Sequence, residues 1–331
     1  MSEPVDMVEV WRGTLRESVH RGHAVICDDT GQIVEAWGDP KAVVYPRSSA
    51  KMLQALPLVE SGAADAFSLS TERLALACAS HQGAHIHTDR VQRWLAALDL
   101  TDDAFRCGPQ TPGDREAREE LIRAGESPCR YHNNCSGKHS GFLTLERHIG
   151  GGPDYVDPAH PVQKAARAAI EEMAQETSPT YGIDGCSAPN FALTMEGMAR
   201  AMARYAALHG GSSTRAAAAT RLADAMMAHP ELVNGEDHAC TNLMRAAKGE
   251  AAIKGGAEGY YVAILPGRRM GVAVKAADGA SRASECMIAS MLVRLGVLDA
   301  ADPVARRYTH PDIRNWDGLV TGHIEPAKTL S

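Results

Sequence analysis

Residues 45–51 read Tyr45-Pro46-Arg47-Ser48-Ser49-Ala50-Lys51, and they mark the change from a strand-rich N-terminus to a helical middle. Pro46 interrupts the strand-forming residues, and a serine two or three positions later can cap a helix. A helix that begins at Ser48 places Lys51 one turn later on the same face, so the hydroxyl and the amine can meet. Burial can lower the pKa of such a lysine enough for it to accept the serine proton. The segment is a candidate Ser-Lys catalytic pair. In isolation, however, the pattern far more often describes a capping serine and a surface lysine, because both residues are common in the first turn of a helix.

Strand-forming segments lie on both sides of the helical middle. The first predicted hairpin joins residues 23–27 to 33–37 across a five-residue loop, and the second joins 260–265 to 270–275. The tail after residue 299 is expected to be irregular. The economical arrangement places both hairpins in one antiparallel sheet covered by helices, which is an α+β fold.

Helical periodicity predominates between the two hairpins. No linker or low-complexity stretch divides the chain, so we expect residues 1–331 to form a single domain with a helical subdomain inserted over about 48–250. His85-Ile86-His87 is expected to be an exposed turn before a helix capped by Thr88. The predicted helices cover residues 48–59 (shortened by Pro57), 71–79, 88–98, 116–123, 161–175, 194–208, 214–227 and 281–295.

The composition favours a cytoplasmic, soluble protein and gives no information about its substrate. Lys and Arg total 34 against 41 Asp and Glu, and the resulting charge of −7 argues against binding to nucleic acid or to an anionic membrane. No apolar stretch approaches the roughly 20 residues that span a bilayer. The first residues lack the basic and apolar regions of a signal peptide.

Two of the eight cysteines stand in unusually polar, glycine-rich segments. Cys135 lies within residues 131–141 and Cys186 within 181–189. Two thiolates brought together would bind a soft cation such as zinc, and Lys138 is one helical turn from Cys135. The spacing alone leaves two ordinary buried thiols as the alternative.

A second serine and a second lysine complete the pattern. Lys254 precedes two glycines at the start of the late hairpin, and Ser80 lies at a predicted helix end. A Ser-x-x-Lys helix followed by a lysine on a late strand is the layout of serine β-lactamases and penicillin-binding proteins. Glycines after the lysine would let a substrate approach a backbone N–H that stabilises an oxyanion. Ser80 alone can also be read as a helix-terminating residue.

Taken together, these segments resemble the rhizobial-type (class 3, asparaginase II family) L-asparaginases over about residues 5–298. The motifs that carry the resemblance are YPRSSAK at 45–51, SHQG at 80–83, HNNCSGKH at 132–139, GIDGC at 182–186 and KGGAEG at 254–259. The resemblance implies a serine β-lactamase-like fold, a homodimer, and hydrolysis of L-asparagine to L-aspartate and ammonia.

The resemblance also implies a role for each matching residue, and Cys240 falls in a family segment without an assigned role. The catalytic residues would be Ser48 as nucleophile, Lys51 as its activating base, and Ser80 with Lys254 as a second Ser-Lys tandem; Cys135, Lys138 and Cys186 would hold Zn²⁺ together with water; Arg47, His139 and Asp184 would bind the amino-acid substrate. Two alternatives stay open. One is another Ser-Lys hydrolase, either a peptidase or a β-lactam-binding protein, and the other is a non-enzymatic, zinc-dependent amino-acid-binding protein.

Overall fold

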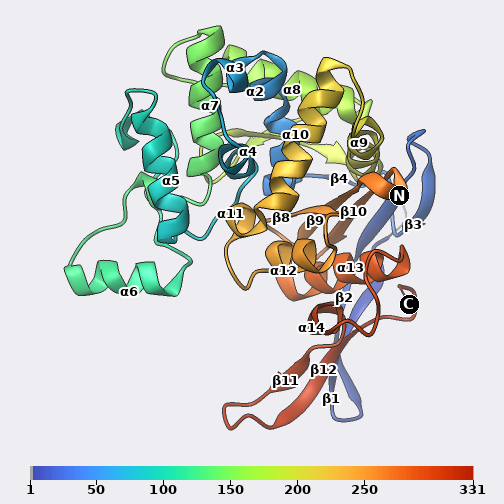
Figure 1. Ribbon diagram of the computed structural model, residues 1–331. Helices are drawn as coiled ribbons and strands as arrows, with labels where there is room; N and C mark the ends of the chain where they lie inside the picture. Colours follow the sequence, from blue (N-terminus) through green and yellow to red (C-terminus); the bar gives the residue numbers. More distant parts are fainter. Residues whose placement is uncertain (1–2, 331) are drawn as a thin grey trace.

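The computed structural model describes residues 3–330, and strands from both ends of the chain come together in one sheet, with the helical middle packed beside it (Figure 1). The strands are β1 (Val5–Arg12), β2 (Leu15–Cys27), β3 (Ile33–Trp37), β4 (Val43–Val44), β5 (Tyr181–Ile183), β6 (Pro189–Phe191), β7 (Leu193–Thr194), β8 (Ala252–Gly256), β9 (Tyr260–Leu265), β10 (Met270–Ala276), β11 (Asp312–Arg314) and β12 (Val320–Pro326). The helices are α1 (Lys51–Gln54), α2 (Leu56–Glu60), α3 (Ala63–Ala66), α4 (Thr71–Ala77), α5 (His85–Ala96), α6 (Arg115–Ala124), α7 (Ser136–Ile149), α8 (Pro161–Ala174), α9 (Met195–Leu208), α10 (Thr214–Ala228), α11 (Pro230–Asn234), α12 (Ala239–Ala246), α13 (Ser281–Arg294) and α14 (Pro303–Thr309). Short 3-10 turns are η1 (Arg47–Ala50), η2 (Asp102–Ala104), η3 (Arg130–His132) and η4 (Pro266–Arg268).

One eight-stranded antiparallel sheet combines the two ends of the chain. Its order is β11-β12-β1-β2-β10-β9-β8, and β3 pairs with β2 beside this path. The N-terminal hairpin meets the C-terminal hairpin where β2 pairs with β10, with Ala24 opposite Val274. The α+β class and the shared antiparallel sheet are therefore confirmed, while the prediction of a single domain over 1–331 stays a prediction.

The prediction of an irregular tail after residue 299 was wrong. Helix α14 and strands β11 and β12 occupy this region, and β12 pairs with β1 in antiparallel register, Ile324 opposite Val10. Only Gly322 and Ile324 of β12 are buried, so the strand lacks the regular apolar alternation that identifies a strand from sequence. Its pairing with β1, rather than its own composition, makes it a strand.

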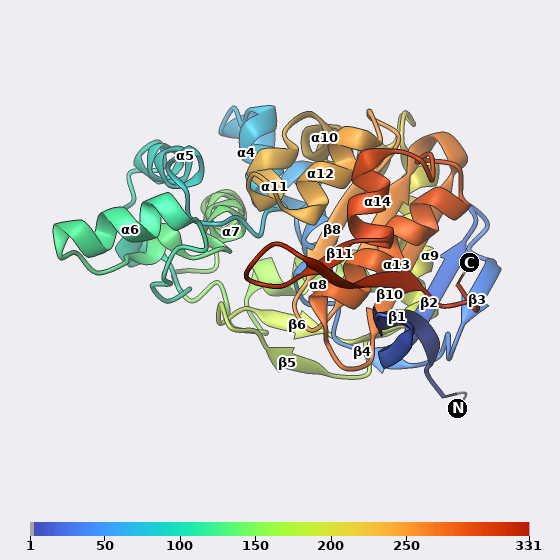
Figure 2. The ribbon, with the colours of Figure 1, turned by 90° about the horizontal axis from the view of Figure 1, so that it is seen from below.

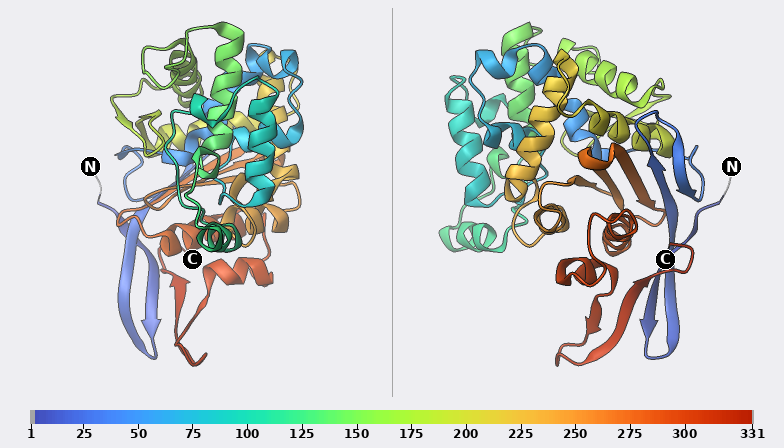
Figure 3. Two further views of the ribbon diagram at one scale, coloured as in Figure 1. Left: turned by 90° about the vertical axis from the view of Figure 1, so that its left-hand side faces the viewer. Right: turned by 45° about the vertical axis from the view of Figure 1, so that its right-hand side comes forward.

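Helices cover both faces of the sheet. Helix α9 packs against β2, β9 and β10, and α13 packs against β1, β9 and β10 from the opposite side (Figure 3). The approach of α9 is close because a Cβ on Gly271 in β10 would lie 2.1 Å from the backbone nitrogen of Ala203. A glycine on the strand and small residues on the helix allow this separation.

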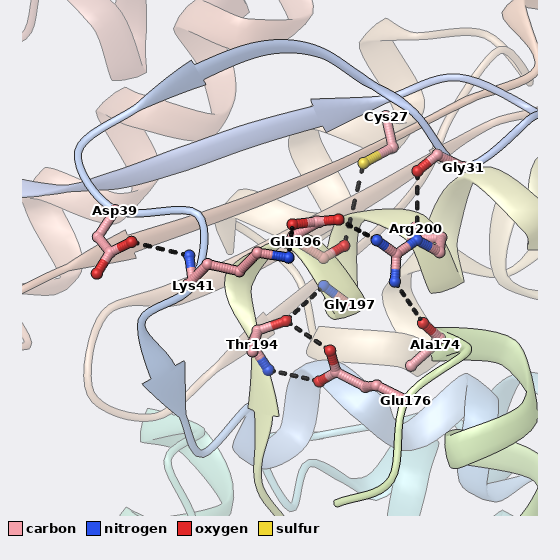
Figure 4. Close-up of polar contacts among 10 residues, drawn as sticks. All are labelled: Cys27, Gly31, Asp39, Lys41, Ala174, Glu176, Thr194, Glu196, Gly197 and Arg200. Atoms are coloured by element: carbon pink, nitrogen blue, oxygen red, sulfur yellow. Dashed lines mark hydrogen bonds and ion pairs between the residues drawn. The ribbon is translucent and has the colours of Figure 1, made fainter. Parts of the chain in front are cut away.

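A polar network fixes the start of α9 (Figure 4). The Thr194 hydroxyl accepts a hydrogen bond from the Gly197 N–H at 2.9 Å, which caps the helix. The Glu176 carboxylate accepts hydrogen bonds from the backbone nitrogen and the hydroxyl of Thr194, each at 2.6 Å. One turn later, Arg200 donates to the carbonyl of Gly31 in the β2–β3 loop at 3.2 Å. These contacts join the helical middle to the N-terminal strands.

The helical middle follows the sequence pattern in most of its long helices, and the differences include the short helices α3, α11 and α12, which were not predicted. The predicted helix over 48–59 is divided into η1, α1 and α2, and Pro57 lies in the first turn of α2. His85–His87 was wrongly predicted as an exposed turn, because α5 begins at His85 and the His87 ring is buried, with Nε2 2.9 Å from the Glu231 carbonyl. Helix α7 was not predicted, because its buried first half is built from serine, glycine, lysine and histidine.

Figure 2 shows α5 and α6 extending to one side of the body that the sheet forms. Within residues 3–330, no helix has both the length and the apolar character that crossing a membrane requires. The cytoplasmic location stays a prediction.

Candidate active site

Three segments that are distant in the sequence bring two lysines to one serine hydroxyl. Ser80 follows α4, and its Oγ lies 3.0 Å from Nζ of Lys51 in α1 and 3.0 Å from Nζ of Lys254 in β8. Both lysines are almost completely enclosed, with 1% and 0% exposure. Three of the four predicted catalytic residues therefore form one buried cluster.

Among the described residues, the amine of Lys51 makes no hydrogen bond to the hydroxyl of Ser48. The two residues lie on one turn, since the Lys51 N–H donates to the Ser48 carbonyl, and the Ser48 side chain is half-buried. The Lys51 amine instead donates to the Ala79 carbonyl, to Ser80 Oγ and to Cys135 Sγ, the last at 3.1 Å. Lys51 thus connects the serine cluster to the thiols of the second segment.

Lys254 lies in surroundings that favour its neutral form. Burial lowers the pKa of Lys254 to about 8, the neighbouring positive charge of Lys51 acts in the same direction, and the Cys240 thiol opposes them. Nζ also donates to the Gly255 carbonyl at 2.6 Å, while the Gly255 N–H donates to Cys240 Sγ at 3.1 Å. An amine with this pKa can exchange a proton near neutral pH.

Strand β8 is held directly against η1 by a residue that the sequence analysis did not single out. Ser49 Oγ donates to the carbonyls of Lys254 at 3.2 Å and Tyr260 at 3.3 Å. A Cβ on Gly256 would lie 2.6 Å from the Pro46 carbonyl oxygen and 2.9 Å from Ser49 Oγ. Ser49 and Gly256 therefore position the Lys254 backbone beside the turn that carries Ser48.

The predicted metal residues also lie together. Cys135 precedes α7 and Lys138 lies in its first turn, and Lys138 Nζ is 3.0 Å from Cys186 Sγ. The pKa of Cys186 is lowered by a hydrogen bond from the Cys135 thiol, by the positive charge of Lys138 and by a hydrogen bond from His139. Burial disfavours the ammonium of Lys138, but the negative charge of the Cys186 thiolate outweighs it and raises the lysine pKa.

His139 lies between this cluster and an aromatic wall. Its ring is fully buried among Phe105, Phe142 and Tyr155, and Nδ1 is 2.8 Å from the Tyr155 hydroxyl. Burial lowers the pKa of His139, so the ring is held in its neutral form. Nε2 has no nitrogen or oxygen partner within residues 3–330, although the imidazole is close enough to affect Cys186.

The donor set suits a soft metal ion. Two cysteine sulfurs, a lysine amine and an imidazole nitrogen without a partner are the atoms that a zinc ion could use. Within the described chain, no group of three or more His, Cys, Asp or Glu residues is arranged to hold a metal. A zinc site here therefore depends on the amine of Lys138 in addition to the cysteines.

The remaining predicted substrate residues form an ion pair. Arg47 Nε and Nη2 lie 3.0 and 2.7 Å from Asp184 Oδ1, and both side chains are mostly buried. Arg47 has a φ of +52°, a conformation that is unfavourable for a residue with a side chain. The hydrogen bond to Asp184 raises the Arg47 pKa and holds the guanidinium next to Ser48 in the chain and beside the segment of Cys186.

Comparison with known proteins gives a family and a number of distant structural neighbours, among them Mglu and a beta-lactamase. The crystal structure of Mglu in its native form shares 15% identity, with 92% of this chain and 70% of Mglu covered at a TM-score of 0.43. A beta-lactamase from Mycobacterium bovis shares 14% identity, with 84% of this chain and 95% of that chain covered at a TM-score of 0.48. No curated protein matched. The family model described as L-asparaginase II matches residues 8–326. The chain therefore belongs to the L-asparaginase II family and is an asparaginase-like hydrolase.

Proposed function

We propose that this protein hydrolyses the side-chain amide of L-asparagine to L-aspartate and ammonia. The observation that carries the proposal is the hydroxyl of Ser80 between two buried lysine amines, with Ser48 one turn from the first of them. Family membership supports the same reaction class. A lysine buried without a carboxylate is a costly feature that structural stability alone does not explain.

Ser48 is the proposed nucleophile. Lys51, in its neutral form, accepts the hydroxyl proton while Oγ bonds to the amide carbon, and the carbonyl oxygen becomes an oxyanion. When the carbon–nitrogen bond breaks, the proton passes to the leaving nitrogen, and ammonia departs from an ester on Ser48. Water then adds to the ester and gives one proton to a neutral lysine. The bond to Ser48 Oγ breaks as the lysine returns this proton to Oγ, and aspartate leaves as the carboxylate after its acid proton passes to solvent. Movement of the Lys51 amine from Ser80 toward Ser48 is required for the first step.

Ser80 and Lys254 are proposed to carry protons between the two lysines. Ser80 can accept a proton from one amine and donate its own to the other, because each amine is 3.0 Å from the same oxygen. Lys254, with a pKa of about 8, can exchange this proton near neutral pH. The relay would keep Lys51 neutral at the start of each acylation.

Arg47, Asp184 and His139 are proposed to bind the amino-acid part of the substrate. A guanidinium suits the α-carboxylate and a carboxylate suits the α-ammonium group. The Arg47–Asp184 ion pair places a positive and a negative group side by side. The α-carboxylate and the α-ammonium group of one amino acid are also adjacent, so the two pairs of charges match. The family resemblance suggests His139, and its buried Nε2 is the atom available for this role.

We further propose that Cys135, Lys138 and Cys186 hold Zn²⁺ with water. Lys138 must lose its proton to bind, and the two sulfurs must both be thiolates. When bound, zinc would supply a fixed cross-link between the start of α7 and the 184–186 loop rather than Lewis-acid chemistry, because its thiolate ligands already neutralise its charge. This cross-link would hold Asp184 and His139 in a constant arrangement toward the substrate.

A coupled assay of ammonia release from L-asparagine and L-glutamine tests the function. Wild type should release ammonia from L-asparagine, and Ser48→Ala and Lys51→Ala should each reduce kcat by roughly 10³-fold or more. Ser212→Ala, an exposed serine outside the site, is the matched control. Absence of turnover together with tight asparagine binding would favour the binding-protein alternative, and a covalent penicillin adduct on Ser48, detected by mass spectrometry, would favour the β-lactam-binding one. Sedimentation equilibrium tests the proposed homodimer.

A further inference from the structure

An open cavity lined by arginines lies between α4 and α5, outside the proposed active site. Its volume is about 390 Å³, within the range of small-molecule sites. The two helices stand side by side, and α4 leads directly into the segment that carries Ser80 (Figure 1). The polar residues that line it, called the arginine pocket here, are Ser68, Ser70, Glu72, Arg73, Arg90 and Arg93.

The arginine pocket has an excess of positive charge. Its one carboxylate, Glu72, is already paired with Arg90 at 2.8 Å. Arg73 and Arg93 have no carboxylate partner among residues 3–330, and Arg93 directs only its Nε to the Asp89 carbonyl at 3.1 Å. Three guanidinium groups therefore line the cavity against one carboxylate, Glu72, which is hydrogen-bonded to Arg90 and whose charge also reaches Arg93.

The chain holds these groups in place although they repel each other. The Arg73 guanidinium lies over the Trp94 ring, 5.9 Å from its centre, which fixes its plane. Burial and the charge of Arg93 both lower the pKa of Arg73, so the pair is unfavourable without an anion. Arg90 Nε is a further buried donor without a partner in the described part of the chain.

We propose that the arginine pocket binds a small phosphate-type oxyanion, either inorganic phosphate or the phosphate group of a small ester. Guanidinium groups bind phosphate oxygens through paired, charge-assisted hydrogen bonds, and a fixed planar fork favours this geometry. The hydroxyls of Ser68 and Ser70 at the rim supply neutral donors of the kind that complete such sites. The volume exceeds that of inorganic phosphate, so it leaves room for the organic part of an ester.

Isothermal titration of the full-length protein with inorganic phosphate, at constant ionic strength set with chloride, tests the site. We expect saturable binding of one phosphate per chain. Arg93→Gln and the double variant Arg73→Gln/Arg93→Gln should weaken it by at least tenfold, while Arg118→Gln, which removes an exposed arginine from neighbouring α6, should leave it unchanged. Because Arg93 is exposed, its variant folds even if the double variant does not.

Glu72→Gln provides a test of opposite sign. This change frees Arg90 and removes the only negative charge of the pocket, so phosphate affinity should rise several-fold. Competition between inorganic phosphate and glycerol 3-phosphate identifies the source, since tighter binding of the ester assigns the remaining volume to an organic group. The proposal is overturned if wild type shows no saturable binding, if Arg93→Gln binds as well as Arg118→Gln, or if succinate binds more tightly than either phosphate.

Discussion

Lys254 donates a hydrogen bond to Ser80 across 174 residues of sequence, with Nζ 3.0 Å from Oγ. The strand that carries the lysine belongs to the C-terminal hairpin, whereas the serine follows a helix of the middle region. Their contact exists only because the sheet combines both ends of the chain and presents β8 to the helices. The proposed chemistry therefore depends on the sheet topology as well as on local motifs.

Lys254 should give the reaction an alkaline dependence. If its neutral form accepts protons from Ser80, activity should rise with pH through about 8, the pKa that burial imposes on Lys254. Lys254→Met should lower kcat by at least tenfold and remove this limb of the profile, whereas Lys248→Met, which changes a lysine before β8, should retain it. If the rise in activity near pH 8 persists in Lys254→Met, that rise belongs to the titration of another group.

The same lysine should make the folded state less stable below pH 8. Its folded pKa lies below the unfolded value of 10.5, so the unfolded chain binds more protons between these values and stability rises as pH increases across them. The cost at pH 7 is on the order of 3 kcal/mol, and Lys254→Met should recover part of it. Urea unfolding of wild type and variant at pH 7 and pH 9.5 measures this, and the variant's advantage should shrink at the higher pH.

Zinc content should depend on Cys186 and on its neighbours in the thiol cluster. The proposed site uses two sulfurs and one amine, so Cys186→Ser should lower zinc affinity by 100-fold or more. Cys286→Ser is the control, because that thiol is buried elsewhere and contacts the Thr309 carbonyl at 3.7 Å. Metal analysis after dialysis against a chelator measures how much zinc each variant retains, and the melting temperature is measured on the same samples. Equal zinc loss in both variants would contradict the assignment.

Local motifs predicted the candidate site because its residues lie in a few short segments of the sequence. Residues three apart share one face of a helix, and this spacing predicted the pairs Ser48–Lys51 and Cys135–Lys138. In the structure, Lys51 and Lys254 both contact Ser80, and Lys138 contacts Cys186. The direction of the Lys51 amine could not be predicted, since it depends on the Ala79 carbonyl and Cys135, which arrive from other elements. The role of Ser49 was missed for a similar reason: its partners are backbone carbonyls of two strands, β8 and β9, about 200 residues away.

The parts of the fold that sequence reasoning missed are those in which tertiary contacts replace periodicity. Helix α7 buries Ser136, Lys138 and His139 in its first half, so its apolar pattern is broken. Strand β12 is mostly accessible and is defined by its pairing with β1. By contrast, the apolar hairpins and the Ala-rich helices have their core faces in the sequence and were predicted correctly.

The cap of α9 should contribute measurable stability. Thr194→Val removes the hydroxyl that accepts from Gly197 and donates to Glu176, and it leaves the carboxylate with one partner fewer. We expect a loss of about 1–2 kcal/mol in the free energy of unfolding. Thr214→Val, at the exposed start of α10, should change it by less than about 0.5 kcal/mol. Urea denaturation of both variants checks the difference, and equal losses would show that the network in Figure 4 adds nothing.

Gly256 should be required for activity as well as for stability. An alanine there would bring its Cβ to 2.6 Å from the Pro46 carbonyl oxygen, a backbone atom that cannot move without shifting η1. The shift would separate Ser48 from the Lys254 strand, so Gly256→Ala should lower kcat by at least tenfold and cost about 1–3 kcal/mol of stability. Gly267→Ala is the control, because an added Cβ meets no atom within 4 Å there and the residue lies in the neighbouring turn η4. Ammonia-release kinetics and urea unfolding distinguish the two effects. A variant that is destabilised but retains full kcat would show that the close approach of β8 to η1 serves packing and not the position of the reacting groups.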